Sequence, residues 1–385
     1  MHALLRSALA RVLAVVGPVL LLLVCALARG DAASGTYTGT LSLRGNYWFE
    51  KSTRVIAPSV AASLATPSGV RVEGSYLLDA ITSASQATGV QDDVSFTEKR
   101  NEVQAGIGYE LDLGGAQLDL SARGRYSKEP DYLSRGLGFG GALSLDQRNT
   151  VLHLNGYFIE DDVFRKERFG DPTRSAQSRA VKVDDLRAIS LGVAWDQVLS
   201  RTTTFTLGYD LALLNGYQAN PYRTAKFADG GGAPERHPDA RARHAGYVWL
   251  AHYLLESRTA LRAGYRLYYD SWEVLAHAPE VRIHQELGQY FELRLRYRYY
   301  TQGGSYFFRQ GGNLRRDRYV TDDPKMSKFH DQTMGMKLRV SLDFLAFTVL
   351  DPLRTAVLDW SVEYVFNTNR YGDGVVAQGG LGWAF

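Results

Sequence analysis

Arginines recur at every second position in one segment of this chain. Between residues 290 and 301, Arg294, Arg296 and Arg298 alternate with apolar and aromatic residues. Residues two apart lie on the same face of a β-strand, and guanidinium groups gathered on one face would favour anions near them. Neighbouring segments with the same alternation extend this face. The resulting predicted basic cluster is Arg262, Arg266, Arg282, Arg294, Arg296, Arg298, Lys337 and Arg339.

Acidic residues follow the same alternation elsewhere in the chain. Those predicted to share the face of the arginines are Glu73, Asp79, Glu102, Glu110, Asp112, Asp119, Asp359 and Glu363. Two interpretations stay open. In a closed sheet, a basic wall opposite an acidic wall would create a transverse field that orients dipolar solutes and favours anions near the arginines. Alternatively, Glu280, Glu286 and Glu292 lie among the arginines, and the charges would form ordinary cross-strand ion pairs.

Groups suited to catalysis or metal binding are sparse. His277 and Asp270 fall near the ends of adjacent predicted strands, but no serine or second acid is fixed beside them, so a hydrogen-bonded rim histidine is expected. His237, Asp239 and His244 lie in a loop without supporting structure. Asp pairs at 92–93, 161–162, 184–185 and 322–323 lack the twelve-residue spacing of a calcium loop. We therefore expect no catalytic residue, no metal, no cofactor and no nucleic-acid partner.

The alternation also predicts the elements that must hold these side chains. Exposing an arginine at the bilayer midplane costs about 2 to 4 kcal/mol, so the arginine face must be enclosed while Phe291, Leu293 and Leu295 face lipid. The sequence therefore predicts a closed antiparallel transmembrane β-barrel of about 16 strands, in a range of roughly 14 to 18. The expected strands span 37–49, 54–65, 69–81, 100–112, 116–126, 132–145, 150–159, 186–197, 202–214, 244–254, 260–270, 278–286, 290–301, 329–344, 354–366 and 373–385.

Connection lengths support this fold independently. Short connections alternate with long ones, and the long ones fall at 82–99, 160–185, 215–243 and 302–328. Short periplasmic turns opposite long external loops are typical of outer-membrane barrels. The loop 302–328 is a candidate constriction at the mouth, with Tyr306, Phe307, Phe308, Arg315 and Arg316. The connection 346–353 is the exception, because it is longer and apolar on the short-turn side.

The two ends of the chain indicate export and membrane insertion. Arg6 and Arg11 precede an apolar run from Val12 to Leu27, which predicts a signal peptide over residues 1–28 with a single-helix anchor as the alternative. Residues 29–385 would then form one barrel domain. The last eleven residues alternate and end on Phe385, as closing strands of outer-membrane barrels do. A soluble sandwich would not account for the export signal, the loop asymmetry and the aromatic terminus together.

Two aromatic motifs carry a family resemblance. Tyr265-Arg-Leu-Tyr-Tyr-Asp-Ser-Trp272 and Tyr297-Arg-Tyr-Tyr-Thr-Gln302, followed by Tyr306-Phe-Phe308, resemble a bacterial family of uncharacterised outer-membrane β-barrels known as a domain of unknown function. The resemblance departs locally at Gly303-Gly304. It implies a barrel fold and a location in the bacterial outer membrane, and it implies no activity.

These observations favour a porin-like channel for small polar or anionic solutes over an enzyme. The alternative is a non-conducting scaffold or receptor that binds a lipoprotein, a redox partner or a surface ligand. Expected partners are outer-membrane lipid and lipopolysaccharide, the barrel-assembly machinery through the strand that ends in Phe385, and a periplasmic lipoprotein or redox protein.

Overall fold

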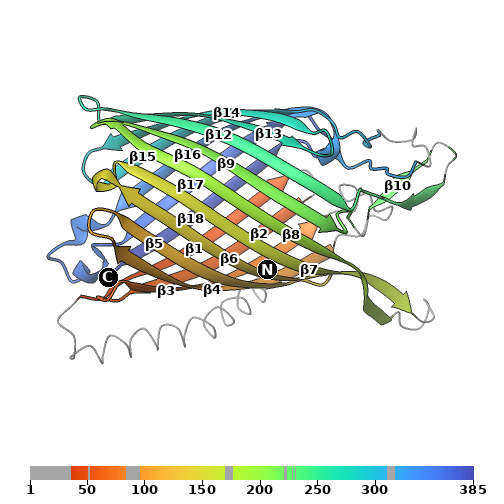
Figure 1. Ribbon diagram of the computed structural model, residues 1–385, viewed down its shortest axis with the longest axis horizontal. Coiled ribbons are helices and arrows are strands. Elements are labelled where there is room, and N and C mark those ends of the chain that lie inside the picture. Colours follow the sequence, from red (N-terminus) through yellow and green to blue (C-terminus); the bar gives the residue numbers. More distant parts are fainter. Residues whose placement is uncertain are drawn as a thin grey trace.

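The chain forms one closed antiparallel β-barrel, seen here in a computed structural model (Figure 1). The structure describes residues 36–50, 53–83, 96–169, 177–220, 223–227, 229, 231–309 and 317–385. Sixteen strands form the wall in sequence order, and the first pairs with the last. The predicted fold class is therefore confirmed. The predicted signal peptide lies outside the described residues.

The wall consists of the following strands: β1 (Thr38–Glu50), β2 (Thr53–Ala65), β3 (Val70–Ser83), β4 (Phe96–Asp112), β5 (Gln117–Lys128), β6 (Tyr132–Leu145), β7 (Thr150–Phe169), β8 (Gln177–Ser200), β9 (Thr203–Gly216), β12 (Ala240–Leu254), β13 (Thr259–Asp270), β14 (Leu275–Leu287), β15 (Phe291–Gln302), β16 (Phe329–Ser341), β17 (Val357–Asn367) and β18 (Gly374–Ala384). A separate two-stranded sheet joins β10 (Thr224–Lys226) to β11 (Gly232–Pro234).

The described helices are all short 3₁₀ turns. They are η1 (Asp146–Arg148), η2 (Pro324–Met326), η3 (Asp343–Leu345) and η4 (Asp351–Leu353). None of the helices in the described part of the chain is long and apolar enough to cross a membrane.

Apolar side chains cover the outer face of the wall. Met334 and Met336 on β16 and Trp360 and Val362 on β17 are 51, 54, 49 and 53% exposed, although a soluble protein would bury residues of this kind. The alternate positions on the same strands carry charged and hydroxyl side chains, which face the inside of the barrel. Hydrocarbon is the solvent that suits such an exterior, and closure of the sheet leaves no unpaired strand edge in it. The chain is therefore a barrel of the bacterial outer membrane.

Strand β18 closes the barrel against β1. The pairing runs from Thr40 opposite Ala384 to Glu50 opposite Gly374. Beyond it, the amide of Gly39 donates to the carbonyl of Phe385 at 2.8 Å, and the amide of Phe385 donates back at 3.0 Å. The terminal residue thus takes part in closure through its main chain, which leaves its ring free to pack beside Trp383 at 5.1 Å between centroids.

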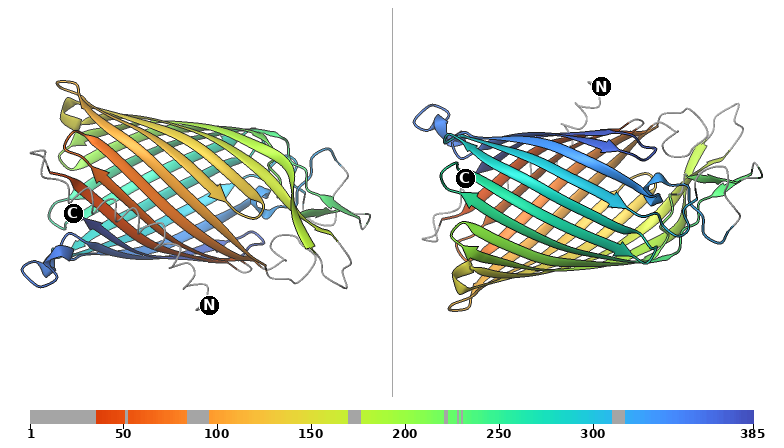
Figure 2. Two further views of the ribbon diagram at one scale, coloured as in Figure 1. Left: turned by 90° about the horizontal axis from the view of Figure 1, so that it is seen from below. Right: turned by 90° about the horizontal axis from the view of Figure 1, so that it is seen from above.

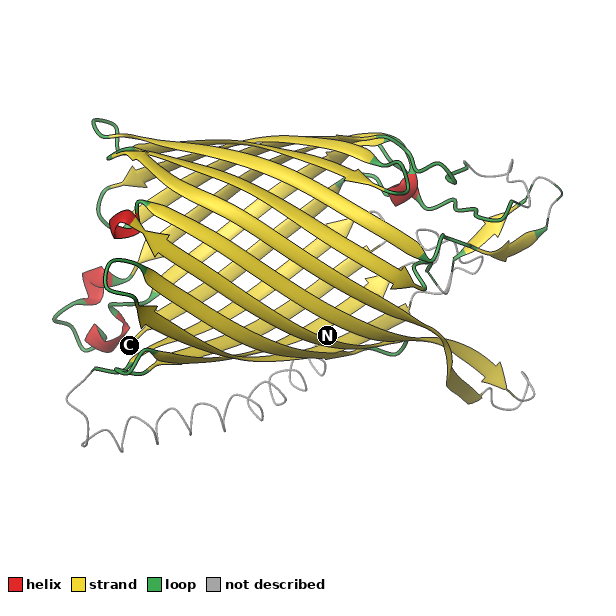
Figure 3. Ribbon diagram, viewed as in Figure 1, coloured by secondary structure: helices red, strands yellow, loops and turns green. Residues whose placement is uncertain are grey.

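The loops and turns gather at the two ends of the barrel (Figure 3). Short turns lie at the end that carries the carboxyl terminus, and long connections lie at the other end, as predicted (Figure 1). The predicted loop 160–185 is wrong in part, because β7 and β8 stay paired as far as Phe169 opposite Gln177. Outside the bilayer a hairpin needs no apolar face, so the loss of alternation at Asp161 and Asp162 did not end the strand. Figure 2 shows this hairpin projecting beyond the rim.

Strand β16 is shorter than predicted. It ends at Ser341 instead of residue 344, and Phe344 lies in η3. The amide of Leu342 donates to the carbonyl of Ala356, which closes residues 342–356 into a long connection before β17. Phe347 and Val349 within it are 98 and 96% exposed.

The long connections pack against one another outside the barrel. We call the described residues of 217–239, 271–274, 303–328 and 368–373 the external cap. Phe307 lies 5.0 Å from Trp272 and 5.3 Å from His237 between ring centroids. Isolated bridges join Arg236 to Val320 and Phe308 to Thr321. The cap therefore has a small core of its own, with Phe307, Val320 and Trp272 at most 2% exposed.

Candidate functional site

The basic cluster lies on the inner face of β13 to β16. Arg262, Arg282 and Arg296 stand directly opposite one another on β13, β14 and β15. The carboxylate of Glu280 bridges the last two, because it accepts hydrogen bonds from Arg282 at 2.5 Å and from Arg296 at 2.9 Å. Arg296 also donates to Glu363 at 2.7 Å. This part of the cluster fits the interpretation as cross-strand ion pairs.

Arg262 instead uses an aromatic partner. Its guanidinium carbon lies 4.6 Å from the centroid of the Trp249 ring, and that of Arg282 lies 4.8 Å from the same centroid. The indole lies against Gly264, where any Cβ would overlap the ring. Trp249 therefore holds two cations through its negative ring face, which sequence alternation alone did not indicate.

Arg266 and Arg298, two further residues of the basic cluster, have other partners. Arg266 pairs with Asp210 at 2.9 Å, and the guanidinium carbon of Arg298 lies 5.0 Å from the ring centroid of Tyr300. Asp210 was absent from the predicted site. Asp210 lies on β9 and Arg266 on β13, with β12 between them, and the register of these three strands brings the two side chains together.

Towards the end of the barrel that carries the carboxyl terminus, Asp359 and Glu292 each pair with two cationic or histidine side chains. Asp359 pairs with Lys337 at 3.1 Å and with Arg44 at 3.3 Å. Glu292 pairs with Arg339 at 3.5 Å and with His284 at 3.0 Å. Arg294 stands directly opposite Lys337 and His284. Among the described residues it makes no ion pair.

The predicted acidic wall carries its own arginines. The pairs are Asp119 with Arg71 at 3.1 Å, Asp79 with Arg100 at 2.9 Å, Glu73 with Arg123 at 2.9 Å, Glu102 with Arg125 at 2.6 Å, and Glu110 with Arg148 at 3.2 Å. Asp112 instead accepts the amide of Gly114 in a turn. The charge of this wall is thus neutralised locally, contrary to an unbalanced acidic face. Arg71, Arg100, Arg123 and Arg125 lie at the same alternate strand positions as the acids, so the alternation could have revealed them, whereas Arg148 lies in the η1 turn.

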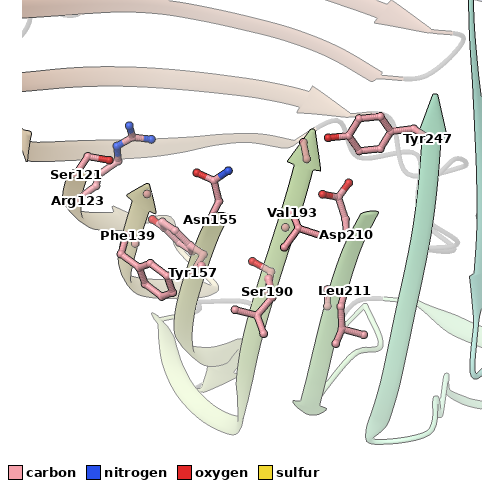
Figure 4. A pocket seen from close by; sticks show the side chains of 17 residues that line it. Ser121, Arg123, Phe139, Asn155, Tyr157, Ser190, Val193, Asp210, Leu211 and Tyr247 are labelled. Atoms are coloured by element: carbon pink, nitrogen blue, oxygen red, sulfur yellow. The ribbon is translucent and has the colours of Figure 1, made fainter. Parts of the chain in front are cut away.

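Two hollows indent the inner wall away from the basic cluster. One of about 370 Å³ lies over Gly138, Gly140 and Gly192 and is lined by Arg123 and Asp210 (Figure 4). The other, of about 300 Å³, is lined by Glu73 and Arg123 beside Ser63 and Ser75. A third hollow, of about 570 Å³, contains Arg294 and its neighbours. Glycines and serines leave this room because they fill little of the lumen.

The candidate constriction loop is packed rather than free. Phe307 is 2% exposed in the core of the external cap, so it lines no aqueous path and that part of the prediction is wrong. Tyr306 is exposed and Phe308 is partly buried, so their role in a constriction stays a prediction. Arg315 and Arg316 lie outside the described residues.

The family motifs hold the external cap in place. Asp270 is fully buried and accepts hydrogen bonds from Tyr268 at 2.6 Å, from the Trp272 amide at 2.9 Å, and from Arg241. Gln302 ties the next loop by donating to the carbonyls of Lys325 at 2.9 Å and Ser327 at 2.8 Å. These residues have structural partners that explain the motifs.

The sparse catalytic candidates are not assembled. His277 hydrogen-bonds Tyr265 at 2.5 Å on the outer face, whereas Asp270 faces inward with Arg241. In the described part of the chain, no three His, Cys, Asp or Glu residues are grouped so as to hold a metal ion.

Comparison with solved structures finds similar barrels. The chain is 8% identical to Pseudomonas aeruginosa OprD, covering 92% of this chain and 98% of that one, with a TM-score of 0.46. It is 8% identical to a bacterial polysaccharide outer-membrane secretin, covering 90 and 98%, with a TM-score of 0.48. It is 9% identical to the siderophore receptor PirA from Acinetobacter baumannii, covering 87% of this chain and 53% of that one, with a TM-score of 0.46.

No curated protein matches the chain by sequence. A family model does match, over residues 58–348, which is well over half of the chain. This agrees with the resemblance carried by the aromatic motifs. The chain belongs to the family described as protein of unknown function (DUF3570).

Proposed function

We propose that the barrel is a passive conduit for small polar solutes across the outer membrane. The observation that carries the proposal is the exposure of charged pairs on the inner face. Arg71 and Asp119 are 38 and 33% exposed, and Arg266 and Asp210 are 47 and 44% exposed, although they point into the barrel. Inward-pointing side chains with this much exposed surface must border space inside the barrel that no other side chain fills.

Barrel size supports the same function. Barrels of about 16 to 18 strands enclose a lumen too wide for wall side chains to fill, and porins of this size carry water. Among the described residues, the loops lie at the ends of the barrel rather than along its interior (Figure 3). A wide lumen lined by ion pairs gives polar solutes a hydrated path through the bilayer.

Single-channel recording tests the proposal. Protein lacking residues 1–28, refolded into a planar bilayer in KCl, is expected to give discrete, voltage-independent conductance steps. The matched control is the same preparation left unfolded, at equal detergent concentration. Heat-modifiable mobility in electrophoresis establishes that the inserted barrel is folded. Folded protein that inserts and gives no conductance contradicts the conduit function.

A receptor function is the second candidate, and the external cap favours it. Its buried core and the long β7–β8 hairpin give the outside of the barrel a built surface. The partner of such a receptor would be a lipoprotein, a redox protein or a surface ligand. Cross-linking in intact cells, with the hairpin removed as the control variant, distinguishes the candidates. A stoichiometric partner lost with the hairpin supports the receptor, and unchanged cross-linking contradicts it.

A further inference from the structure

The three hollows described above differ in charge. The hollow in Figure 4 contains one arginine and one aspartate, and the hollow beside Glu73 also balances one charge against another. The third is lined by four permanent cations, Arg44, Arg294, Lys337 and Arg339, but only two carboxylates, Glu292 and Asp359. Four positive charges against two negative charges leave a net charge of +2 before His284 is counted.

Arg294 concentrates this excess. It stands directly across from Lys337 on one side and from His284 on the other. Like charges placed directly opposite on a sheet are destabilising. Arg262, Arg282 and Arg296 also stand opposite one another, but Trp249 and Glu280 compensate them. On the early strands, Arg71, Arg123 and Arg125 are each paired with an acid. Arg294 stands beside Lys337 and has no ion pair among the described residues, so we expect it to attract an anion from solution.

The hollow has the size and the donors for such an anion. Its volume is about 570 Å³, within the usual range of small-molecule sites. Thr40 and Ser42 add hydroxyl groups to its lining, and Thr355 places it near the connection before β17. Guanidinium, ammonium and hydroxyl groups together suit carboxylate or phosphate oxygens.

We propose that this hollow, around Arg294, Lys337 and Arg339, binds small oxyanions and makes the barrel anion-selective at its carboxyl-terminal end. The inference rests on the proposed conduit function for its role in transport. Binding itself does not depend on conduction. The shared chemistry is a carboxylate or phosphate group, and the two are separated by experiment.

Block of chloride current by phosphate or citrate tests the site. Both probes are expected to reduce the current at millimolar concentration, and Arg294→Gln is expected to raise the half-blocking concentration about ten-fold, the size of one strong charge-assisted contact. The probe whose half-blocking concentration rises more in Arg294→Gln contains the oxyanion that the site prefers. Reversal potentials in a KCl gradient should show anion preference in the native barrel and a smaller preference in Arg294→Gln.

Arg123→Gln is the matched control. It removes the same charge from the inner wall, but from an arginine paired with Glu73. If the net charge of the lumen alone were responsible, both variants would shift block and selectivity equally, and the proposed site would be overturned. A shift confined to Arg294→Gln supports it.

Equilibrium dialysis with radioactive phosphate separates this inference from the conduit function. Folded protein in detergent should bind phosphate, and Arg294→Gln should lose that binding while Arg123→Gln keeps it. Binding without conductance would leave the site standing and remove the conduit. Conductance without phosphate or citrate binding would remove the site and leave the conduit.

Discussion

Asp270 illustrates how single residues fix this structure. Its side chain is fully buried, and both oxygens are occupied by Arg241, Tyr268 and the amides of Trp272 and Val274. The guanidinium of Arg241 also lies over the Trp272 ring, at 3.9 Å from the centroid. One carboxylate thus joins the end of β13 to the turn that follows and to β12.

Replacing Asp270 by Asn is expected to destabilise the fold strongly. The change leaves Arg241 as an uncompensated buried charge, which costs about 3 to 5 kcal/mol. Asp210→Asn breaks an exposed pair with Arg266 and should cost about 0 to 1 kcal/mol. Urea unfolding of refolded protein measures both free energies. Similar losses in the two variants would contradict the structural role of Asp270.

Tyr371 in the external cap gives a prediction about pH. Burial raises the pKa of this phenol, and the nearby Asp323 raises it further. The hydroxyl accepts from Arg223 at 2.6 Å and donates to Asp323 at 3.3 Å. Because the pKa is raised on folding, the stabilisation is complete below the ordinary value of about 10 and is lost as the pH rises above it.

Urea unfolding at about pH 8 and about pH 11 checks this sign. The native protein should lose more stability between the two pH values than Tyr371→Phe, which has no ionisable group at this position. An equal loss in both proteins would show that other groups govern alkaline unfolding.

At the scale of elements, the connection 342–356 is the least expected. Its apolar residues extend the lipid-facing stripe of β16 towards the carboxyl-terminal end, and Phe344 packs edge-on against Tyr290 at 5.5 Å. The indole of Trp383 donates to the carbonyl of Pro352 at 3.0 Å and so ties the connection to β18. Its continuity with the lipid-facing surface predicts that Phe347 and Val349 lie among lipid headgroups.

A spin label can locate this connection. Cys25 is the only cysteine and precedes the predicted barrel domain, so protein from residue 29 with Phe347→Cys carries a single label site. The label in lipid vesicles should be accessible to oxygen and shielded from a water-soluble nickel complex. Tyr306→Cys in the external cap is the control and should behave oppositely. Equal nickel accessibility at both positions would contradict lipid contact.

Strand β18 yields a prediction about assembly. The main chain of Phe385 closes the barrel, so Phe385→Ala keeps both hydrogen bonds with Gly39 and should refold normally in detergent. In cells, loss of the aromatic terminus should lower the amount of assembled barrel several-fold, because the assembly machinery is expected to recognise it. Phe366→Ala removes an equally outward ring from β17 as the control. Equal assembly of the two variants would contradict this recognition.

At the scale of the whole molecule, the barrel and the external cap are separable. Hydrogen bonds between strands close the wall completely, whereas the cap holds itself together through Phe307, Val320 and Trp272. Deleting residues 304–326 should therefore leave a heat-modifiable barrel. Its single-channel conductance should rise, because the deleted segment belongs to the loops at the mouth. Unchanged conductance would show that this loop does not limit flow, and loss of heat modifiability would show that the cap supports the wall.

Much of the wall could be predicted from sequence because its information is local. The segment 290–301 and the observed β15 (Phe291–Gln302) agree closely, since alternation and the cost of placing arginine in lipid act within one strand. Alternation did not predict the structure of segments that lipid does not contact. The β7–β8 hairpin beyond Ile159 and the external cap lie outside the bilayer, where neither face has to be apolar.

The sequence by itself determined that this chain is a closed outer-membrane barrel, which way its side chains face, and which end carries the long loops. Only the tertiary structure decided which charges meet. Arg71 and Asp119 are 48 residues apart, and Arg44 and Asp359 are 315 apart, yet each pair is in contact. Such pairs depend on register summed across strands and on the closure of β1 against β18. Neither is encoded by a local period, so only the folded wall reveals that Arg294 has no ion pair among the described residues.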